Sequence, residues 1–205
     1  MSEVPQPKPS LIDNLSGSLD IMLGRENGMA KIDHSAAGFW LSFWGIVLMA
    51  LIDTSALSMI YDVIAEAKED RGYSKPSYIF LRLLIALLGY GASFVALYLL
   101  CRTSDEQSRF PDAIIVNNWS AAILSFAFLP LIWMSTLAAP VSTSDGPPGA
   151  FVLLVLVSWA IITIAGIRIL KTSLKISVAK AAIYFAASSA VSILLNEGFQ
   201  SLVGL

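Results

Sequence analysis

Charged residues are scarce in this sequence, at 14% of 205 residues, whereas a soluble domain usually carries about 25%. The net charge is only −2, so the composition supplies no strongly basic face, and no nucleic-acid partner is expected. The single cysteine, Cys101, excludes an intramolecular disulfide and a cysteine-based metal cluster. The single histidine, His34, excludes a multi-histidine metal site.

Motifs of soluble enzymes are also missing. The sequence has no Gly-rich phosphate loop of the P-loop or dinucleotide type, no His-Glu-x-x-His and no Gly-x-Ser-x-Gly. Intramembrane proteolysis would need paired acids or a Ser-His pair inside the spans, and Asp53 is the only acid there. We therefore predict no catalytic residue, metal site or cofactor site, and we expect a protein that is not an enzyme.

Apolar residues are abundant, at 56% of the chain, and they gather in five long blocks. A helix needs about 20 mostly apolar residues to cross about 30 Å of hydrocarbon. The predicted fold is therefore all-α, a polytopic membrane protein with a bundle of five transmembrane helices. The predicted spans are residues 36–59, 78–100, 114–138, 149–170 and 176–196. The fifth block is rich in Ala and Ser, and without it both termini would lie on one side of the membrane.

The residues before the first span divide into two parts. Residues 1–10 contain three prolines and few large apolar groups, which is typical of a disordered tail. Residues 11–24 carry apolar side chains at three- and four-residue steps, which predicts an amphipathic helix that ends near Gly24. That helix is too short to cross a bilayer, so it lies either on the membrane surface or packed against its own chain. Residues 11–35 thus form a cytoplasmic amphipathic or interfacial segment.

The orientation follows from the basic residues, which favour the cytoplasmic side in short loops. With five spans, the N-terminal region and the second and fourth loops share one side, and they hold most of the 13 Lys and Arg residues. These residues are Lys8, Arg25, Lys31, Arg102, Arg109, Arg168, Lys171, Lys175 and Lys180. The sequence therefore predicts a cytoplasmic N-terminus and an external C-terminus.

Asp53 is the sharpest polar feature, because a carboxylate inside a span costs roughly 2.5–3.5 kcal/mol on insertion scales. Asp53 lies about 9 Å inside the outer end of the first span, and Arg82 about 6 Å inside the same end of the second, at about 1.5 Å per residue. The two residues form a candidate intramembrane polar pair. It is either a structural ion pair that joins the two spans, or a proton or ion site.

A second polar cluster, Asn117, Asn118 and Trp119, opens the third span. Asparagine side chains in hydrocarbon seek hydrogen-bond partners across helices. Near the inner interface the same residues can instead meet headgroups, with Trp119 as a residue of the aromatic belt. The sequence leaves anchoring, packing and ligand binding open for this cluster.

Small residues recur at three- and four-residue steps on two spans, which permits close approach of helices. They are Ala86, Gly89, Ser93 and Ala96 in the second span, and Ala182, Ala186, Ser189 and Ala190 in the fifth. We expect both faces to pack against other helices, against another membrane protein or against a second copy, while the remaining surface meets the lipid bilayer.

Two short segments resemble a known family. The stretch Asp33 to Phe43 (Asp-His-Ser-Ala-Ala-Gly-Phe-Trp-Leu-Ser-Phe) leads into the first span, and the pair Asn118-Trp119 opens the third. Together with the five closely spaced spans, they make the chain similar to the Yip-type family and to small bacterial proteins of that broad group. The eukaryotic Asp-Leu-Tyr-Gly-Pro motif is absent, and Gly89-Tyr90 lacks the proline expected after it, so no role in vesicle traffic is carried over. The resemblance implies a non-catalytic five-helix protein of the bacterial plasma membrane that acts through partners or lipid.

Three functions remain open from the sequence. The first is a membrane scaffold or accessory subunit, which the short loops and small-residue faces favour. The second is a small transporter or channel component that uses Asp53 with polar residues of the second and third spans. The third is a lipid-interacting protein that acts through residues 11–24.

Overall fold

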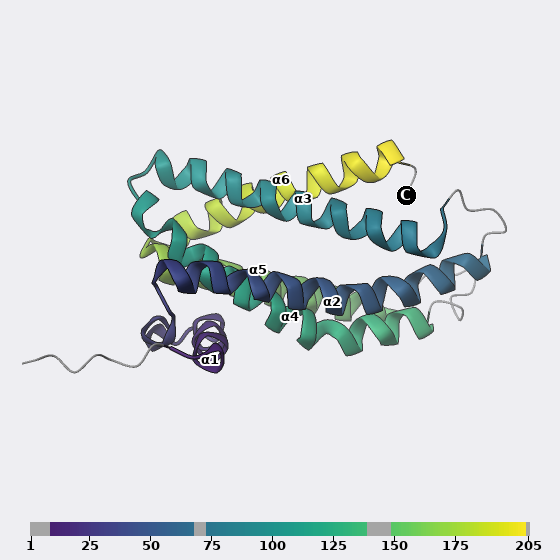
Figure 1. Ribbon diagram of the computed structural model, residues 1–205, viewed down its shortest axis with the longest axis horizontal. Coiled ribbons are helices and arrows are strands. Elements are labelled where there is room, and N and C mark those ends of the chain that lie inside the picture. Colours follow the sequence, from purple (N-terminus) through teal and green to yellow (C-terminus); the bar gives the residue numbers. More distant parts are fainter. Residues whose placement is uncertain (1–8, 68–72, 139–148, 204–205) are drawn as a thin grey trace, which may run out of the picture.

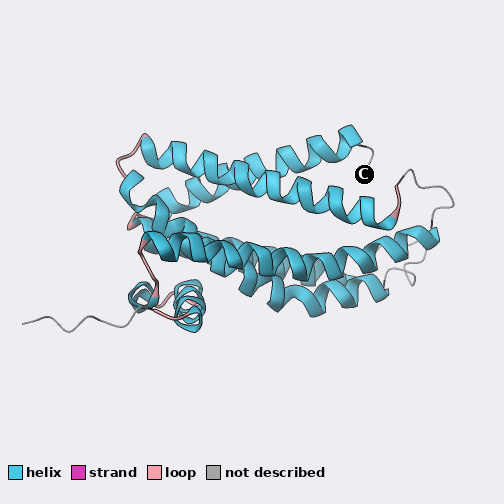
Figure 2. Ribbon diagram, in the orientation of Figure 1, coloured by secondary structure: helices cyan, strands magenta, loops and turns pink. Residues whose placement is uncertain are grey.

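The computed structural model describes residues 9–67, 73–138 and 149–203, and all regular structure within these ranges is helical (Figures 1 and 2). The elements are α1 (Leu11–Met22), η1 (Glu26–Lys31), α2 (Ala36–Ala67), α3 (Lys75–Arg102), η2 (Gln107–Arg109), α4 (Phe110–Ala138), α5 (Gly149–Leu174) and α6 (Val178–Val203). Most of the predicted disordered tail, residues 1–8, lies outside the described residues.

Helices α2 to α6 are each long and apolar enough to cross a membrane. The chain is therefore an all-α integral membrane protein with a bundle of five transmembrane helices, as predicted. The fifth block forms a helix of 26 residues with a mean hydropathy of 1.7. Because the five helices alternate in direction, α1 and the end of α6 at Val203 lie at opposite ends of the bundle (Figure 1).

Each helix extends beyond its predicted span at one end or at both, although α6 begins at Val178, two residues after the predicted start, because local backbone chemistry and not the edge of the apolar block sets the helix ends. Helix α3 begins at Lys75 instead of residue 78, since Ser74 at the N-cap position is extended, without a side-chain capping bond, and a proline follows in the first turn. Helix α5 continues to Leu174 and stops where Lys175 adopts a positive φ of 55°. Polar first and last turns thus belong to the helices although they lie outside the apolar blocks.

Two pairings organise the bundle. Helix α2 packs mainly on α4, and α3 mainly on α6, while α5 contacts both α4 and α6. In Figure 1, α3 and α6 cross each other on one side of the molecule, and α2, α4 and α5 lie together on the other. Large apolar side chains face outward: Trp40 is 71% exposed, Leu51 65% and Leu194 72%. Such a surface matches hydrocarbon better than water, which agrees with contact to the lipid bilayer.

Helix α1 lies across one end of the bundle against α4 and α5 (Figure 1). Ser10 caps it: the Ser10 hydroxyl accepts from the Asp13 N–H at 3.2 Å, and the Asp13 carboxylate accepts from the Ser10 N–H at 2.8 Å. The helix ends as predicted, because Gly24 adopts a φ of +84° that side chains rarely tolerate. Arg168 of α5 then donates to the Met22 carbonyl at 2.9 Å, which fixes the end of α1 to the bundle.

Candidate functional site

Asn118 is fully buried and joins three helices through hydrogen bonds. Its side-chain NH₂ donates to the Ser42 hydroxyl of α2 at 2.9 Å, and Ser42 donates to the Phe39 carbonyl at 2.7 Å. The Tyr90 hydroxyl of α3 donates to the Asn118 carboxamide oxygen at 3.3 Å and accepts from the Asn117 NH₂ at 2.7 Å. Both asparagines therefore have partners across helices. Each such bond contributes about 0.6 kcal/mol on average in a membrane protein.

Trp119 is buried inside the bundle, which excludes the aromatic-belt alternative and favours the packing alternative. The side chain is 0% exposed and lies in a core cluster with Ile21 and Met22 of α1, Ile32, and Ile169 of α5. The sequence places Trp119 near the end of a span, but α1 folds over that end and covers it. Its indole N–H has no hydrogen-bond partner among the described residues, so packing alone holds this ring.

Asp53 and Arg82 do not contact each other in the structure. Asp53 lies beside the Ser125 hydroxyl of α4, whereas the Arg82 guanidinium donates to the Gln200 carboxamide of α6 and lies 5.4 Å from the centre of the Tyr78 ring. The two residues have similar depth, but α2 turns Asp53 toward α4 and α3 turns Arg82 toward α6. Similar depth on consecutive spans was therefore not sufficient to pair them.

A cavity of about 200 Å³ lies beside Asn117, between α3, α4, α5 and α6. Its lining is Tyr90, Ser93, Phe94, Leu97, Asn117, Gly166, Leu170, Phe185, Ser188, Ser189 and Ser192. Polar and aromatic groups thus meet in the middle of the bundle, with no Asp, Glu, Lys or Arg among the lining residues. Among these residues the sequence predicts Asn117 as a site residue and Ser93 and Ser189 as small residues for packing, whereas it does not predict Tyr90, Ser188 or Ser192 as site residues.

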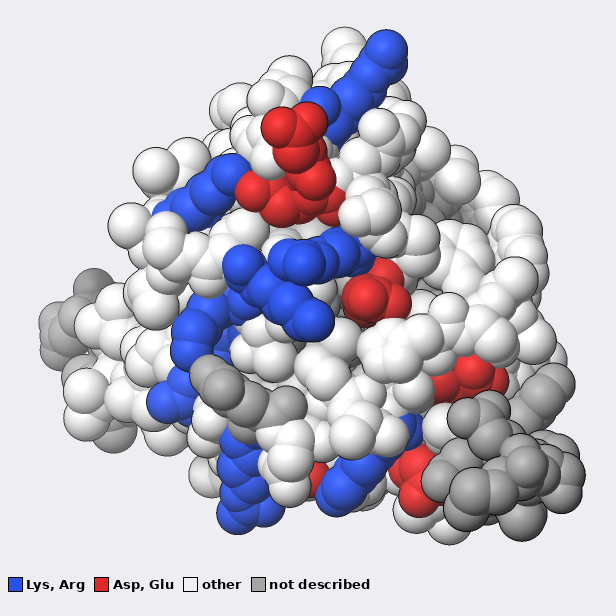
Figure 3. Space-filling view, turned by 90° about the vertical axis from the view of Figure 1, so that its left-hand side faces the viewer, with Lys and Arg blue, Asp and Glu red and all other residues white. Residues whose placement is uncertain are grey.

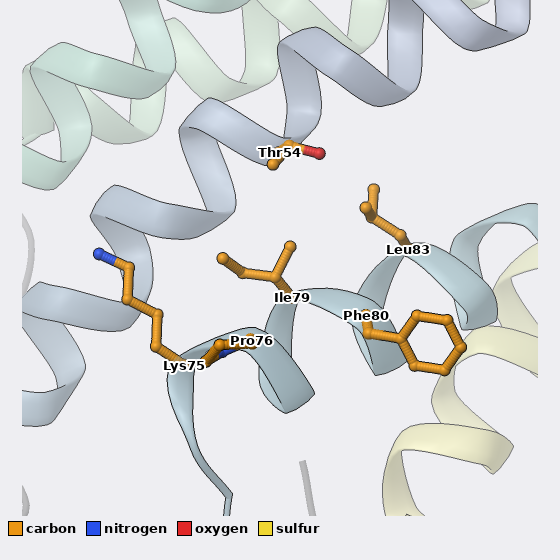
Figure 4. Close-up of a pocket in the computed structure, with 6 residues that line it drawn as sticks. All are labelled: Thr54, Lys75, Pro76, Ile79, Phe80 and Leu83. Atoms are coloured by element: carbon orange, nitrogen blue, oxygen red, sulfur yellow. The ribbon is translucent and has the colours of Figure 1, made fainter.

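A larger pocket of about 490 Å³ lies between α2 and α3 near the opposite end (Figure 4). It is lined by Thr54, Lys75, Pro76, Ile79, Phe80 and Leu83, and it is open and mostly apolar. Lys75 reaches away from it toward α2, where its ammonium lies 2.8 Å from the Asp62 carboxylate. An open apolar hollow between two membrane helices suits a lipid chain and offers no reactive group.

The end of the bundle that carries α1 is rich in charged side chains (Figure 3). Lys180 of α6 lies 2.5 Å from Glu106, whose other oxygen accepts from the Tyr184 hydroxyl at 3.1 Å. His34 lies 2.7 Å from Asp112. Burial disfavours the charged ring, but the hydrogen bonds to Asp112 and to the Met29 carbonyl outweigh it and raise the pKa of His34.

Asp20 of α1 is also paired, with two basic residues that follow the helix. Asp20 lies 2.7 Å from the Lys31 ammonium and 2.9 Å from Arg25. The hydrogen bond from Lys31, which has the larger effect, and that from Arg25 hold the pKa of Asp20 below its usual range. Arg109 donates to the Leu174 carbonyl at 3.0 Å and so compensates the end of α5. Most charges at this end thus fasten α1 and the helix ends to each other.

The fold and these contacts define a polytopic integral membrane protein whose polar groups are mostly shared between neighbouring helices. Comparison with known protein families, with curated proteins and with solved structures gives no match. The resemblance to the Yip-type family therefore stays a prediction from the sequence.

Proposed function

We propose that the protein is a non-enzymatic membrane scaffold or accessory subunit that works through lipid and protein contacts. The observation that carries this proposal is the orientation of α1. The polar side chains of Asn14 and Ser18 are on the buried side of α1, which faces the bundle. The apolar side chains of Ile12, Leu19 and Leu23 are exposed by 74%, 43% and 54%. Seven- and four-residue spacings place these three apolar side chains on one face of the helix.

An exposed apolar face on α1 supports insertion into the membrane interface instead of burial against the protein's own loops. The exposed Trp40 and Trp44, near the start of α2, lie at the same end of the bundle and are suited to the headgroup region. Exposed Arg25 and Lys175 are at this end too, and a basic side chain near an anionic leaflet contributes about 1 kcal/mol. The basic residues favour a cytoplasmic N-terminus, and the proposal of a bacterial plasma membrane rests on the resemblance to the Yip-type family.

The protein-contact part of the proposal rests on small residues that the bundle leaves uncovered. Gly89 is used internally: a Cβ there would lie 3.0 Å from the Ser192 hydroxyl of α6. Ala186 and Ala190, by contrast, are exposed on α6 at a four-residue spacing, and Gly198 has no neighbouring atom within 4 Å. This outer face of α6 can accept a helix of another membrane protein or of a second copy.

Spin labels test the lipid contact. We expect labels at Ile12→Cys and Leu19→Cys in nanodiscs to show high oxygen accessibility and low accessibility to a water-soluble nickel reagent. A label at Ser108→Cys, which is exposed on η2, serves as the matched control and should show the reverse. High nickel accessibility at both α1 positions would remove lipid contact from the proposal.

Extraction in native lipid tests the scaffold role. Polymer particles cut from the membrane should contain the chain together with a second copy or a defined partner, and Ala190→Cys should crosslink to it. Particles with a single copy and no other protein would refute the scaffold role, whatever the result for α1.

A further inference from the structure

Helix α6 carries a line of polar residues at a strict four-residue spacing. They are Lys180, Tyr184, Ser188, Ser192, Asn196 and Gln200. At about 1.5 Å per residue, the line from Lys180 to Gln200 is about 30 Å long, which equals the thickness of the hydrocarbon core. Polar side chains through the whole depth of a span are unfavourable in lipid, so they require partners or water inside the protein.

The line faces α3 along its length. Lys180 and Tyr184 contact Glu106, just beyond the end of α3, and the Tyr184 hydroxyl also donates to the Leu100 carbonyl at 3.1 Å. At the other end Gln200 accepts from Arg82 of α3. Both ends of the α3–α6 seam are thus closed by direct contacts between long side chains.

The middle of the seam is hollow, because its residues are short. Ser188 and Ser192 line the cavity of about 200 Å³, opposite Tyr90 and Ser93 of α3. One water occupies about 30 Å³ of liquid, so the cavity has room for roughly six waters or for one solute of a few heavy atoms. Ligand sites for larger molecules measure about 300–1,000 Å³.

The hydrogen bonds already made by the residues that line the cavity favour a ligand that donates hydrogen bonds to the lining. The Ser93 hydroxyl already donates to the Tyr90 carbonyl at 2.7 Å, and the Ser188 hydroxyl donates to the Tyr184 carbonyl at 2.8 Å. Their oxygens keep acceptor capacity toward the cavity, and the Asn117 carboxamide oxygen has no donor among the described residues. A bound molecule therefore meets several acceptors and few free donors.

The other walls select against charge. Phe94, Leu97, Leu170 and Phe185 surround the polar groups, and no ionised side chain lines the cavity. A charged solute would lose its hydration without an opposite charge, at a cost of several kcal/mol. A short polyol meets both conditions, because its hydroxyls donate to the serine and asparagine oxygens while its carbons contact the aromatic rings.

We propose that the cavity between α3 and α6 is an intramembrane binding site for a small uncharged polyhydroxyl solute of the size of glycerol. Tyr90, Asn117, Ser188 and Ser192 are its hydrogen-bonding residues. This role is independent of the scaffold function, since it uses the interior of the bundle and neither α1 nor the outer face of α6.

Thiol labelling in nanodiscs tests the site, with Ser192→Cys in the cavity and Leu194→Cys as the matched control on the lipid-facing side of α6. A neutral water-soluble methanethiosulfonate should modify Ser192→Cys about tenfold faster, since the thiolate forms only where water or polar groups reach it. Glycerol should slow labelling at Ser192→Cys at least about twofold by occupying the polar lining, while tert-butanol at equal concentration should not. Cys101 is 0% exposed, so the unsubstituted protein gives the background.

Each other outcome overturns the proposal. Equal rates at Ser192→Cys and Leu194→Cys mean that the cavity is closed to water. Rapid labelling without glycerol protection means that it holds water only, and equal protection by tert-butanol means that the hydroxyls are not recognised. If Ser192→Cys does not fold, saturation transfer from the unsubstituted protein to glycerol decides instead. It should be strong, and it should fall at least about twofold in Asn117→Leu, which lacks the amide contacts; no transfer would refute the site.

Discussion

Replacing Gly45 with alanine tests whether the contact between α2 and α4 is as close as the structure shows. A Cβ at Gly45 would lie 2.3 Å from the Asn118 carbonyl oxygen and 2.8 Å from its carbonyl carbon. Both are backbone atoms and cannot rotate away. Since ordinary contact begins near 3.4 Å, α2 and α4 must separate by about 1 Å at this point.

This separation has two energetic consequences. Overpacking of a close contact typically costs about 1–3 kcal/mol. A shift of about 1 Å also stretches the 2.9 Å bond between Ser42 and Asn118 beyond hydrogen-bond range, which removes about 0.6 kcal/mol more. We therefore expect Gly45→Ala to lower the free energy of unfolding by about 1.6–3.6 kcal/mol. Reversible unfolding in mixed micelles, with increasing SDS, measures this change.

Gly91→Ala is the matched control, because Gly91 lies inside α3 and has no neighbouring atom within 4 Å. There the added methyl should leave stability unchanged or raise it by up to about 1 kcal/mol through the higher helix propensity of alanine. Equal stability of Gly45→Ala and the unsubstituted protein would refute the close contact. Equal loss in both variants would show that the effect does not come from the contact with Asn118.

Two further predictions concern ionisable groups. In double-mutant cycles measured with the same unfolding assay, Asp53→Asn and Arg82→Ala should have additive effects on stability, within about 0.5 kcal/mol. Arg82→Ala and Gln200→Ala should instead be coupled. Coupling between Asp53 and Arg82 alone would contradict the observed partners. The contact of His34 with Asp112 raises the pKa of the ring in the folded protein, so its stabilisation is complete below the unfolded pKa of about 6.5 and is lost as pH rises through the higher folded value. The free energy of unfolding measured across this pH range should show that loss of stability, and His34→Gln should abolish the pH dependence. An identical pH profile in His34→Gln would refute the contribution of the His34–Asp112 contact.

The five spans could be predicted because burying a helix in lipid depends on composition alone, and composition is read directly from the sequence. The ends of the helices are harder to predict from the sequence. Ser74 and the positive φ of Lys175 extend or stop helices outside the apolar blocks, so hydropathy could not locate them. The stop at Gly24 was predicted correctly, because glycine after an amphipathic segment has a local conformational meaning.

The site was harder to predict, since it depends on which way each helix is rotated. Depth along a span can be counted, so Asp53 and Arg82 were matched in depth, but the direction of each side chain is set by the neighbour that its helix selects. For Trp119 the sequence leaves packing and anchoring open for a related reason. The side chain is buried because α1 covers it, and no local pattern near Trp119 indicates that contact. The four-residue line on α6 can be seen in the sequence, but hydropathy does not show that it faces α3. Ser189, which also lines the cavity, is predicted from the sequence only as a small residue for packing.

The crossing of α3 and α6 accounts for the order of residue sizes along α6 (Figure 1). Rows of residues four apart are inclined to a helix axis by about 26°, so two helices that meet along such rows cross each other and are closest in the middle. Long side chains accordingly occupy the two extremes, at Lys180 and Gln200. Gly89 allows α3 to approach Asn196 and Ser192 of α6 closely, beside the cavity that the serines line. Because α3 and α6 cross near Gly89, a bulkier residue there would push the two helices apart along their whole length. The change would therefore alter the contacts of the pair at both membrane surfaces.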